Sequence, residues 1–583
     1  MPTLEWIGKD KVVNHHLDVP YRVLERQYSF DENGKHDADN GSENMIIHGD
    51  NLEALKSLLP QYEGRVKCIY IDPPYNTGNE GWVYNDNVND PRIREWLNKT
   101  VGKEGEDLSR HDKWLCMMYP RLKLLQKLLA EDGVIFISID DTEYANLKLI
   151  CDEIFGSNCF VSNISWQRTY STRNDSKGIV NEVEHLLVYS KQPDWNPNKL
   201  PRTEEMNSKY KNPDNDRTLW RTDNAFAPGA ATHQGMVYAI QHPFTGKMLY
   251  PANGRCWTFG QDQMLEIMRG WCDYELRDLN DAHERAVVCG VADEDVRQGV
   301  QAIVLSEPLD ISAKKAQAVY ERGQWPRFFF TKGGKGGIAR KTYLENVGGK
   351  LPTNFWPFSE TGHTDEAKKE MLAIFDGKAT FDTPKPRRLL EFVLKVAGSE
   401  DALILDSFAG SGTTAHAVLN MNKADGGHRK FILVEMMDYA DSITAERVKR
   451  VIDGYGEGKN TVAGTGGSFS YYELGEPLMN GDVLNENVGV EKIREYVYFT
   501  DTKSRLPEPH PDEPYFMGVH VNSAYYFYYE REAVTTLNRK FLHTVKTQAD
   551  AYVIYADLCT LSDAELEKYH ITFKKIPRDI TKL

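Results

Sequence analysis

The sequence has few cysteines, and they are not paired. Eight cysteines are scattered over 583 residues, with no C-x-x-C pair and no histidine at metal-ligand spacing. This pattern argues against a structural zinc site and against a disulfide framework. It is typical of a protein kept in a reducing compartment.

Long apolar runs are also missing. No run approaches the length of a membrane-spanning helix, and the first residues, MPTLEWIGKDKVVNHH, lack the apolar core of a signal peptide. We therefore expect a cytoplasmic protein with no membrane partner. At 583 residues the chain is too long for one hydrophobic core, and its length predicts roughly three or four structural units.

Positive charge is in deficit. The chain has 70 Lys and Arg against 86 Asp and Glu, which gives a formal net charge of −16 at pH 7. The overall field of such a protein repels polyanions. If nucleic acid is a partner, a local basic cleft has to bind it.

The stretch IYIDPPYNTGN ends an apolar run with two prolines. The run at 66–71, VKCIYI, predicts a strand buried on both faces, as in a parallel sheet covered by helices. Pro73 and Pro74 lack a backbone N–H and fix φ, so they stop the strand. Asp72 and Tyr75 are left at the carboxyl end of the strand, where they are candidates for a reaction site.

A glycine-rich turn at 406–414, DSFAGSGTT, lies between the apolar run ALIL and a predicted helix. Gly410 and Gly412 allow a tight turn and a close approach to a ligand at the helix N-terminus. No lysine precedes Thr413, so this is not a Walker A loop. The alternative is a purely structural turn. Glu435 ends the next strand, where an acidic residue can accept hydrogen bonds from ribose hydroxyls, and it favours a nucleotide-like ligand.

Strand and helix patterns alternate in two parts of the chain, which predicts an open α/β sheet. In the first part, 113–133 predicts a helix ended by Gly133 and 133–141 predicts the next buried strand. In such sheets, ligands bind outside the carboxyl ends of the strands at the topological switch point. We therefore expect the double-proline turn and the glycine turn to face one crevice, although more than 300 residues separate them.

These motifs resemble those of the amino-group DNA methyltransferases that use S-adenosylmethionine, in the order of the β group. Residues 72–75 match the catalytic tetrapeptide [DNS]PP[YFW], and 408–412 match the cofactor motif. The segments GDNLEAL at 49–55, GVIFISIDD at 133–141 and TPKP at 383–386 match motifs between and beside them. NTG after the tetrapeptide and IPRD near the C-terminus most resemble the modification (Mod) subunit of type III restriction–modification systems.

The resemblance implies a Rossmann-like doubly wound methyltransferase sheet with an inserted target-recognition domain and a small C-terminal domain. The expected parts are an N-terminal arm at 1–44, the catalytic half at 45–195, the target-recognition insert at 196–375, the cofactor-binding half at 376–465, and a C-terminal domain for dimerisation or partner binding at 466–583.

The resemblance also implies a mechanism. An exocyclic amine on a base is a poor nucleophile because its lone pair is delocalised. Asp72 and the Pro73 carbonyl can each accept one N–H, and the two prolines, Pro73 and Pro74, hold these acceptors for in-line methyl transfer. Tyr75 offers a face on which a flipped-out base can stack. No metal and no covalent intermediate are required, and the aspartate form favours adenine N6 over cytosine N4.

Contacts with S-adenosyl-L-methionine follow from the same correspondence. The expected cofactor residues are Asp50, Asp72, Thr383, Lys385, Asp406, Phe408, Ala409, Gly410, Gly412, Thr413 and Glu435. For Asp50 the alternative is a helix N-cap before LEALKSLL.

Candidate DNA contacts are basic and aromatic side chains in and before the insert. They are Trp166, Arg168, Arg173, Arg217, Arg221, Lys335, Arg340 and Lys341. The alternative for Trp166 is a core residue, and for GGKGGIARK at 333–341 it is a solvated loop. YYFYY at 525–529 predicts a buried strand rather than a base-stacking platform.

Taken together, the sequence predicts a sequence-specific DNA adenine methyltransferase. The family resemblance implies double-stranded DNA as substrate, a homodimer, and a separate helicase–nuclease (Res-type) subunit in a restriction–modification or related phage-defence system. Two alternatives stay open: an N4-cytosine methyltransferase, and a DNA-binding specificity scaffold with little turnover.

Overall fold

A computed structural model describes most of the chain. The described residues are 3–77, 95, 99, 110–170 and 179–578. No helix in these ranges combines the length and the hydrophobicity that a bilayer span requires.

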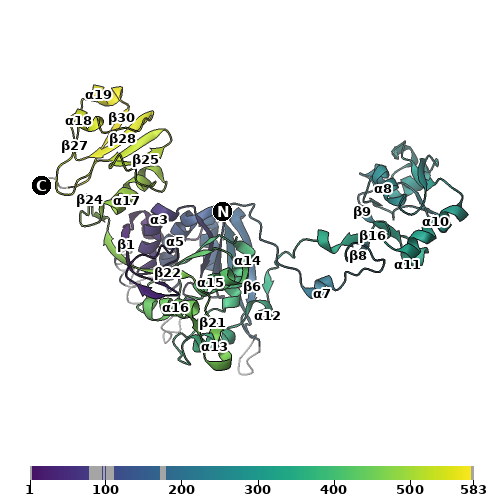
Figure 1. The fold of residues 1–583 in the computed structure, drawn as a ribbon, viewed down its shortest axis with the longest axis horizontal. Coiled ribbons are helices and arrows are strands. Elements are labelled where there is room, and N and C mark those ends of the chain that lie inside the picture. Colours follow the sequence, from purple (N-terminus) through teal and green to yellow (C-terminus); the bar gives the residue numbers. More distant parts are fainter. Residues whose placement is uncertain (1–2, 78–94, 96–98, 100–109, 171–178, 579–583) are drawn as a thin grey trace. The chain divides into compact units, whose positions relative to one another are not determined.

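The chain divides into two compact units (Figure 1). Unit 1 consists of Met1–Asn198 and Pro352–Leu583, and unit 2 is Lys199–Leu351. The insert predicted at 196–375 therefore begins close to unit 2 but extends past its end. Helix α13 (Thr364–Ile374) packs against α16 (Glu446–Asp453) of unit 1, so residues after 351 fold with the sheet rather than with the insert.

Unit 1 is built on an eleven-stranded sheet in the order β17-β6-β7-β5-β4-β18-β19-β3-β22-β1-β2. The central run from β5 to β22 is parallel. Its strands are β5 (Leu129–Ile139), β4 (Val66–Ile71), β18 (Leu403–Asp406), β19 (Lys430–Glu435), β3 (Met45–His48) and β22 (Ser468–Pro477). The outer strands on one side are β7 (Val183–Ser190), β6 (Phe160–Gln167) and β17 (Phe355–Trp356).

Strands β4 and β18 lie side by side, with Cys68 opposite Ile404 and Ile69 opposite Leu405. From β4 the chain continues to β5 on one side, and from β18 it continues to β19 on the other. The order of strands thus reverses between β4 and β18, and this is the switch point of a doubly wound sheet. The α/β fold expected from the sequence is confirmed.

Helices cover the sheet. One group, packed into the core with Ile69 and Ile71, is α3 (Asn51–Tyr62), α5 (Arg110–Leu128) and α6 (Tyr144–Phe155). A second group, packed together and against β4, β5 and β19, is α14 (Arg387–Ala397), α15 (Thr413–Asp425) and α16 (Glu446–Asp453). Cys68 and Tyr70 alternate with the two isoleucines and are buried as well. Both faces of β4 are therefore covered, as its apolar sequence predicts.

The helix predicted at 113–133 ends earlier than expected. Helix α5 stops at Leu128, and β5 begins at Leu129. Leu129 pairs with Val66, and the register then shifts so that Val134 pairs with Cys68. Residues 130–133 are thus taken into a bulged strand, because pairing with β4 outweighs the helix preference of Ala130 and Glu131.

The N-terminal segment is a strand of the sheet and not a free arm. Strand β1 (Arg22–Asp31) pairs antiparallel with β22, and β2 (Gly34–His36) forms the edge of the sheet. Tyr28 stacks on Tyr471, and Phe30 stacks on Phe469. This pairing also places 468–477, expected in the C-terminal domain, within the main sheet.

Later residues of unit 1 form a separate sheet in the order β25-β26-β28-β30. Its strands are β25 (Phe516–His520), β26 (Ser523–Phe527), β28 (Ala551–Ala556) and β30 (Ile571–Lys575). Tyr526 and Phe527 are buried in β26, which confirms the buried strand predicted for YYFYY.

Unit 2 contains a four-stranded sheet, β11-β10-β14-β13, and a three-stranded sheet, β15-β16-β8. The strands of the first sheet are β11 (Met248–Leu249), β10 (Ile240–Gln241), β14 (Ala302–Leu305) and β13 (Tyr274–Arg277). The strands of the second sheet are β15 (Phe328–Phe330), β16 (Ile338–Tyr343) and β8 (Trp220–Asn224). Aromatic side chains such as Trp220, Trp257, Trp271 and Phe328 fill one core of this unit. Unit 2 thus has a hydrophobic core of its own.

The strand role of the N-terminal segment predicts a stability effect. Phe30→Ala removes a buried ring from the β1–β22 contact and should lower the free energy of unfolding by about 3–5 kcal/mol. Asp37→Ala, at an exposed position just beyond β2, should change it by less than about 0.5 kcal/mol. Urea unfolding of the full chain measures both. Equal, small effects would contradict the strand assignment.

Candidate functional site

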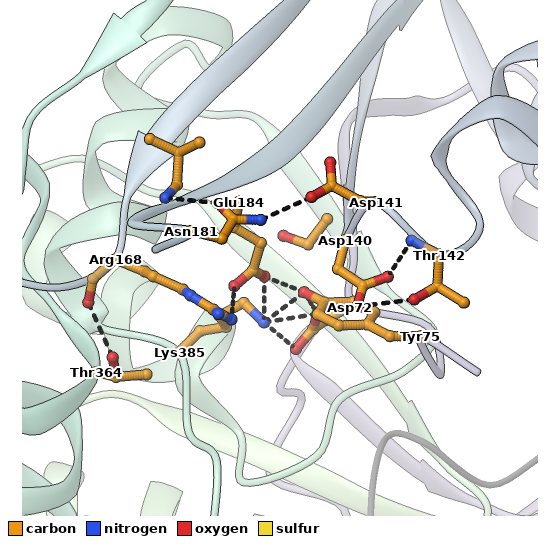
Figure 2. A network of polar contacts seen from close by, with 12 residues as sticks. Asp72, Tyr75, Asp140, Asp141, Thr142, Arg168, Asn181, Glu184, Thr364 and Lys385 are labelled. Carbon is orange, nitrogen blue, oxygen red and sulfur yellow. Dashed lines mark hydrogen bonds and ion pairs between the residues drawn. The ribbon is translucent and has the colours of Figure 1, made fainter. Parts of the chain in front are cut away.

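Asp72 follows β4 directly, and its carboxylate is held by two neighbours (Figure 2). The Lys385 ammonium donates to both carboxylate oxygens, at 2.8 and 2.9 Å. The Tyr75 hydroxyl donates to one of them at 2.8 Å. Asp72 is only 8% exposed, so these contacts fix a nearly buried charge at the end of the strand.

A second carboxylate belongs to the same network. Glu184, near the start of β7, accepts from the Tyr75 hydroxyl and lies 3.0 Å from the Lys385 ammonium. A guanidinium nitrogen of Arg168 lies 3.7 Å from the other oxygen of Glu184. Lys385 also donates to the Tyr75 hydroxyl at 2.8 Å. Two carboxylates therefore share one ammonium and one phenol.

The charged groups of this network shift one another's pKa values. Burial raises the pKa of Asp72, and the nearby Lys385 ammonium offsets part of that rise. Burial alone would lower the pKa of Lys385, but the two carboxylates Asp72 and Glu184 outweigh it and hold the pKa above its usual value. The lysine therefore stays protonated and supplies the cation that makes a buried carboxylate pair tolerable.

The turn itself is braced by the helix layer. The Trp114 indole N–H donates to the Pro74 carbonyl at 2.6 Å. The Tyr75 ring is only 8% exposed, and the Lys385 ammonium lies 4.9 Å from the ring centroid. In this structure the lysine thus covers the ring on which we predict that a base stacks.

The glycine turn connects β18 to α15 along a path that needs glycine. Gly410 and Gly412 have φ of 51° and 78°, in the left-handed region. A Cβ on Gly412 would meet the Thr444 carbonyl oxygen at 3.0 Å. The Gly410 N–H donates to the Glu435 carboxylate at 2.8 Å. This bond ties the turn to the end of β19.

Buried carboxylates line the strand ends on both sides of the turn. Asp406 accepts from the Thr414 hydroxyl at 2.6 Å and from the Phe408 N–H at 3.0 Å. Burial raises the pKa of Asp406 to about 7 and that of Glu435 to about 7. Two acidic groups that titrate near neutrality therefore stand at the ends of β18 and β19.

A pocket opens between the two turns. Eight of the predicted cofactor residues line it, namely Asp72, Thr383, Lys385, Asp406, Phe408, Ala409, Gly410 and Thr413. The Thr383 hydroxyl oxygen is buried without a hydrogen-bond partner among the described residues. A buried hydroxyl of this kind needs a polar partner, so the pocket fits a ligand with a hydrogen-bonding group.

Asp50 has a structural role. Its side chain accepts from the N–H groups of Leu52 and Glu53, at 2.8 and 3.3 Å, and so caps α3. It also lies 3.6 Å from the Arg121 guanidinium. The N-cap alternative is confirmed. Three predicted cofactor residues, Asp50, Gly412 and Glu435, do not line the pocket. Glu435 is connected to the pocket lining through its hydrogen bond with the Gly410 N–H.

Sequence reasoning missed Glu184 and Trp114. One signal for Glu184 was present, because it interrupts the strand-forming sequence VEHLLVYS. A carboxylate at a buried strand position calls for a partner cation. The partner, Lys385, is 201 residues away in sequence by its number, and no local pattern connects the two.

The three candidate DNA contacts of unit 1 lie in different surroundings. Trp166 is 2% exposed and donates to the Gly362 carbonyl at 3.3 Å, so it belongs to the core and the predicted base contact is corrected. Arg168 faces the catalytic network through Glu184. Arg173 lies outside the described residues.

In unit 2, Arg217, Arg221 and Lys335 are exposed, and their DNA contacts stay predictions. Arg340 is half-buried and pairs with Asp223 at 3.1 Å. The exposed cations are therefore the better candidates for phosphate contacts.

Lys341 is corrected from a DNA contact to a structural residue. Its side chain is 0% exposed, and its ammonium pairs with Asp214 at 2.5 Å and Asp216 at 2.6 Å. It also donates to the Trp325 carbonyl at 2.7 Å. Its neighbours in strand β16 gave no sign of this burial, because both partner carboxylates come from a distant loop.

The chain is similar in sequence to known proteins. A family model described as DNA methylase matches residues 66–446, more than half of the chain. This range contains the tetrapeptide, unit 2 and the glycine turn.

Individual relatives agree with the family match. The Type III restriction-modification enzyme StyLTI Mod subunit of Salmonella typhimurium is 34% identical over 434 residues, which are 70% of this chain and 57% of that protein. The chain thus spans little more than half the length of this relative. The Type II methyltransferase M.KpnI of Klebsiella pneumoniae is 30% identical over 67% of this chain and 80% of its own length. Among solved structures, the PvuII DNA methyltransferase (cytosine-N4-specific) is 13% identical with a TM-score of 0.31, over 70% of this chain and 86% of that one.

Lys341 predicts a stability effect without a direct effect on DNA contact. Lys341→Met leaves Asp214 and Asp216 with an uncompensated buried charge and should destabilise unit 2 by about 3–5 kcal/mol. Lys335→Met, at an exposed position in the same region, should change stability by less than about 0.5 kcal/mol. Thermal unfolding of the full chain compares the two. Equal melting profiles would contradict the buried ion pair.

Proposed function

The chain belongs to the DNA methylase family, and we propose that it is a sequence-specific DNA methyltransferase that transfers a methyl group from S-adenosyl-L-methionine to N6 of a flipped-out adenine. One observation carries this proposal: Asp72 of the tetrapeptide and the glycine turn of the cofactor motif line the same pocket. The reacting group and the methyl donor can therefore meet there.

The geometry supports an in-line transfer. The amine nitrogen of adenine gains electron density when its two N–H groups donate hydrogen bonds to Asp72 and to the Pro73 carbonyl. Pro73 and Pro74 stiffen the turn, and Trp114 fixes the Pro74 carbonyl at 2.6 Å. Acceptors held in place before the reaction contribute through positioning and electrostatics.

The pocket residues fit the parts of S-adenosyl-L-methionine. The cofactor supplies a methyl group activated on a sulfonium centre. Thr383 offers a buried hydroxyl that lacks a partner among the described residues. Glu435 lies behind the pocket lining, bonded to the Gly410 N–H, and is the proposed acceptor for ribose hydroxyls at the end of β19. Phe408 and the turn backbone at Gly410 bound the pocket beside Asp72.

The proposed biological setting is the modification and specificity subunit of a type III restriction–modification or related phage-defence system. The relative from Salmonella typhimurium, 34% identical, is named as such a Mod subunit. Unit 2 is the proposed target-recognition domain, since it is a compact unit between the two halves of the sheet in sequence. The partners are double-stranded DNA, a second copy of the chain, and a separate Res-type helicase–nuclease subunit.

Genome-wide mapping of modified bases tests this function. A host that expresses the wild-type chain should acquire N6-methyladenine at one sequence motif, and a host that expresses Asp72→Ala should not. N4-methylcytosine in place of N6-methyladenine would support the cytosine alternative. An unmodified genome with the wild-type chain would support the scaffold alternative.

Asp72 should matter for catalysis more than for cofactor affinity. Asp72→Ala removes an acceptor for the amine N–H. The rate of methyl transfer should fall by more than about 100-fold, because the amine is no longer held in line with the methyl group. Isothermal titration with S-adenosyl-L-methionine should show binding weakened by roughly tenfold at most. A near wild-type transfer rate would refute the assigned mechanism.

DNA affinity should depend steeply on salt, because an acidic chain can bind DNA only through a local group of cations. Lys335→Ala should weaken binding about equally for all sequences and reduce the slope of log K against log salt by roughly 1. Fluorescence anisotropy at several salt concentrations measures both. A salt-insensitive affinity would count against direct DNA binding by this chain.

A further inference from the structure

Glu184 is a buried residue of strand β7, and its carboxylate shares two neighbouring side chains with the carboxylate of Asp72. It is 4% exposed, and it contacts the Tyr75 hydroxyl and the Lys385 ammonium, both of which also contact Asp72 (Figure 2). The two carboxylates are thus bridged twice, once through a phenol and once through an ammonium.

A position of this kind is costly for the fold. A buried carboxylate destabilises a protein unless cations and hydrogen bonds compensate it, and an apolar side chain of similar size is often as stable. Lys385, at 3.0 Å, and Arg168, at 3.7 Å, provide the cations for Glu184. Core packing alone gives no reason for a second carboxylate beside the first.

The bridges act on the orientation of Asp72. The Lys385 ammonium reaches both Asp72 oxygens within 2.9 Å and reaches Glu184 at 3.0 Å. Without Glu184, the long lysine side chain would lose one of its three partners, which are Asp72, Glu184 and the Tyr75 hydroxyl. The Tyr75 hydroxyl has one proton and two carboxylate acceptors within reach, Asp72 and Glu184, so it would lose one of these two acceptors as well.

We propose that Glu184 is a positioning residue for methyl transfer: it anchors the Lys385 ammonium and the Tyr75 side chain beside Asp72, so that Asp72 is oriented to accept the N–H of the target amine and then its proton. This inference rests on the proposed function. It concerns the residue that prepares the acceptor, while Glu184 itself does not touch the substrate.

The reaction balances with Asp72 as the acceptor. The lone pair of the amine nitrogen forms the new N–CH₃ bond, and the S–CH₃ bond breaks with its electron pair going to sulfur, which becomes a neutral thioether. The nitrogen then carries a positive charge and releases one proton to the Asp72 carboxylate. Asp72 passes this proton to water when the product leaves.

The rate of methyl transfer should fall at low pH, because Asp72 has to be ionised to accept the proton. The pH of this fall, called the acid limb of the rate profile, depends on the charges around Asp72. The charged and titratable groups around Asp72 are Tyr70 of β4, Tyr75 of the turn, Glu184 of β7, Lys385 before α14 and Asp406 of β18. Among them, the Lys385 ammonium lowers the pKa of Asp72, whereas the Glu184 carboxylate raises it. Removal of one or the other should therefore move the acid limb in opposite directions.

The test is the single-turnover rate of methyl transfer as a function of pH, on a duplex that carries the motif found by base mapping. Glu184→Gln should lower the plateau rate by roughly 100-fold, the cost of a misplaced reacting group, and move the acid limb to lower pH. Lys385→Met should also lower the plateau rate but move the acid limb to higher pH. Opposite shifts are a result that simple loss of structure does not give.

Two further variants control for folding. Glu182→Gln, the same substitution at a half-buried position two residues earlier, should keep the wild-type rate and profile. Glu184→Asp keeps the charge but shortens the side chain, so it should lose rate while its acid limb stays near that of the wild type. If Glu184→Gln folds poorly, the rate of Glu184→Asp tests the positioning role instead.

The outcomes separate the inference from the proposed function. A wild-type rate with Glu184→Gln, or acid limbs that shift in the same direction in Glu184→Gln and Lys385→Met, would overturn the positioning role while the function stands. No methyl transfer by the wild-type chain to any duplex would overturn the proposed function and this inference with it.

Discussion

The site depends on the pairing of β4 with β18. This pairing joins two segments that are far apart in sequence, and it sets the ends of both strands at the same edge of the sheet. Asp72 follows one strand and the glycine turn follows the other. Because the strand order reverses here, the connections that leave β4 and β18 run to opposite sides of the sheet, and a ligand can bind between the two turns. In the proposed reaction, methyl donor and acceptor meet where the ends of these two strands lie side by side.

Burial gives the site its electrostatic character. Asp72, Glu184, Asp406 and Glu435 are all buried near the strand ends, and Lys385 is the cation shared by the first two. In this setting a charge interacts more strongly with its neighbours than it does in water. The same lysine lies 4.9 Å from the centroid of the Tyr75 ring, so one side chain contacts both the Asp72 carboxylate and the ring proposed to stack on the base.

The sequence predicted the parts of the fold that depend on local patterns. Strand β4, strand β18 and helix α15 were each marked by an apolar run, a proline stop or a glycine turn, and the family motifs placed the pocket residues. The pairing of β1 with β22 was not predictable, since its partners lie at opposite ends of the chain. Glu184 was missed and Lys341 was misassigned for the same reason, because their partner charges come from distant segments: a glutamate or a lysine shows its burial only when its partner is known.

The most direct test of the central claim is to locate the methyl donor on the chain. Labelled S-adenosyl-L-methionine can be crosslinked to the wild-type protein by ultraviolet light, and the labelled peptides identified by mass spectrometry. The account predicts label in peptides that contain residues 381–385 or 406–414, the walls of the pocket beside Asp72. Label confined to unit 2 or to the C-terminal sheet would contradict a cofactor site at the switch point.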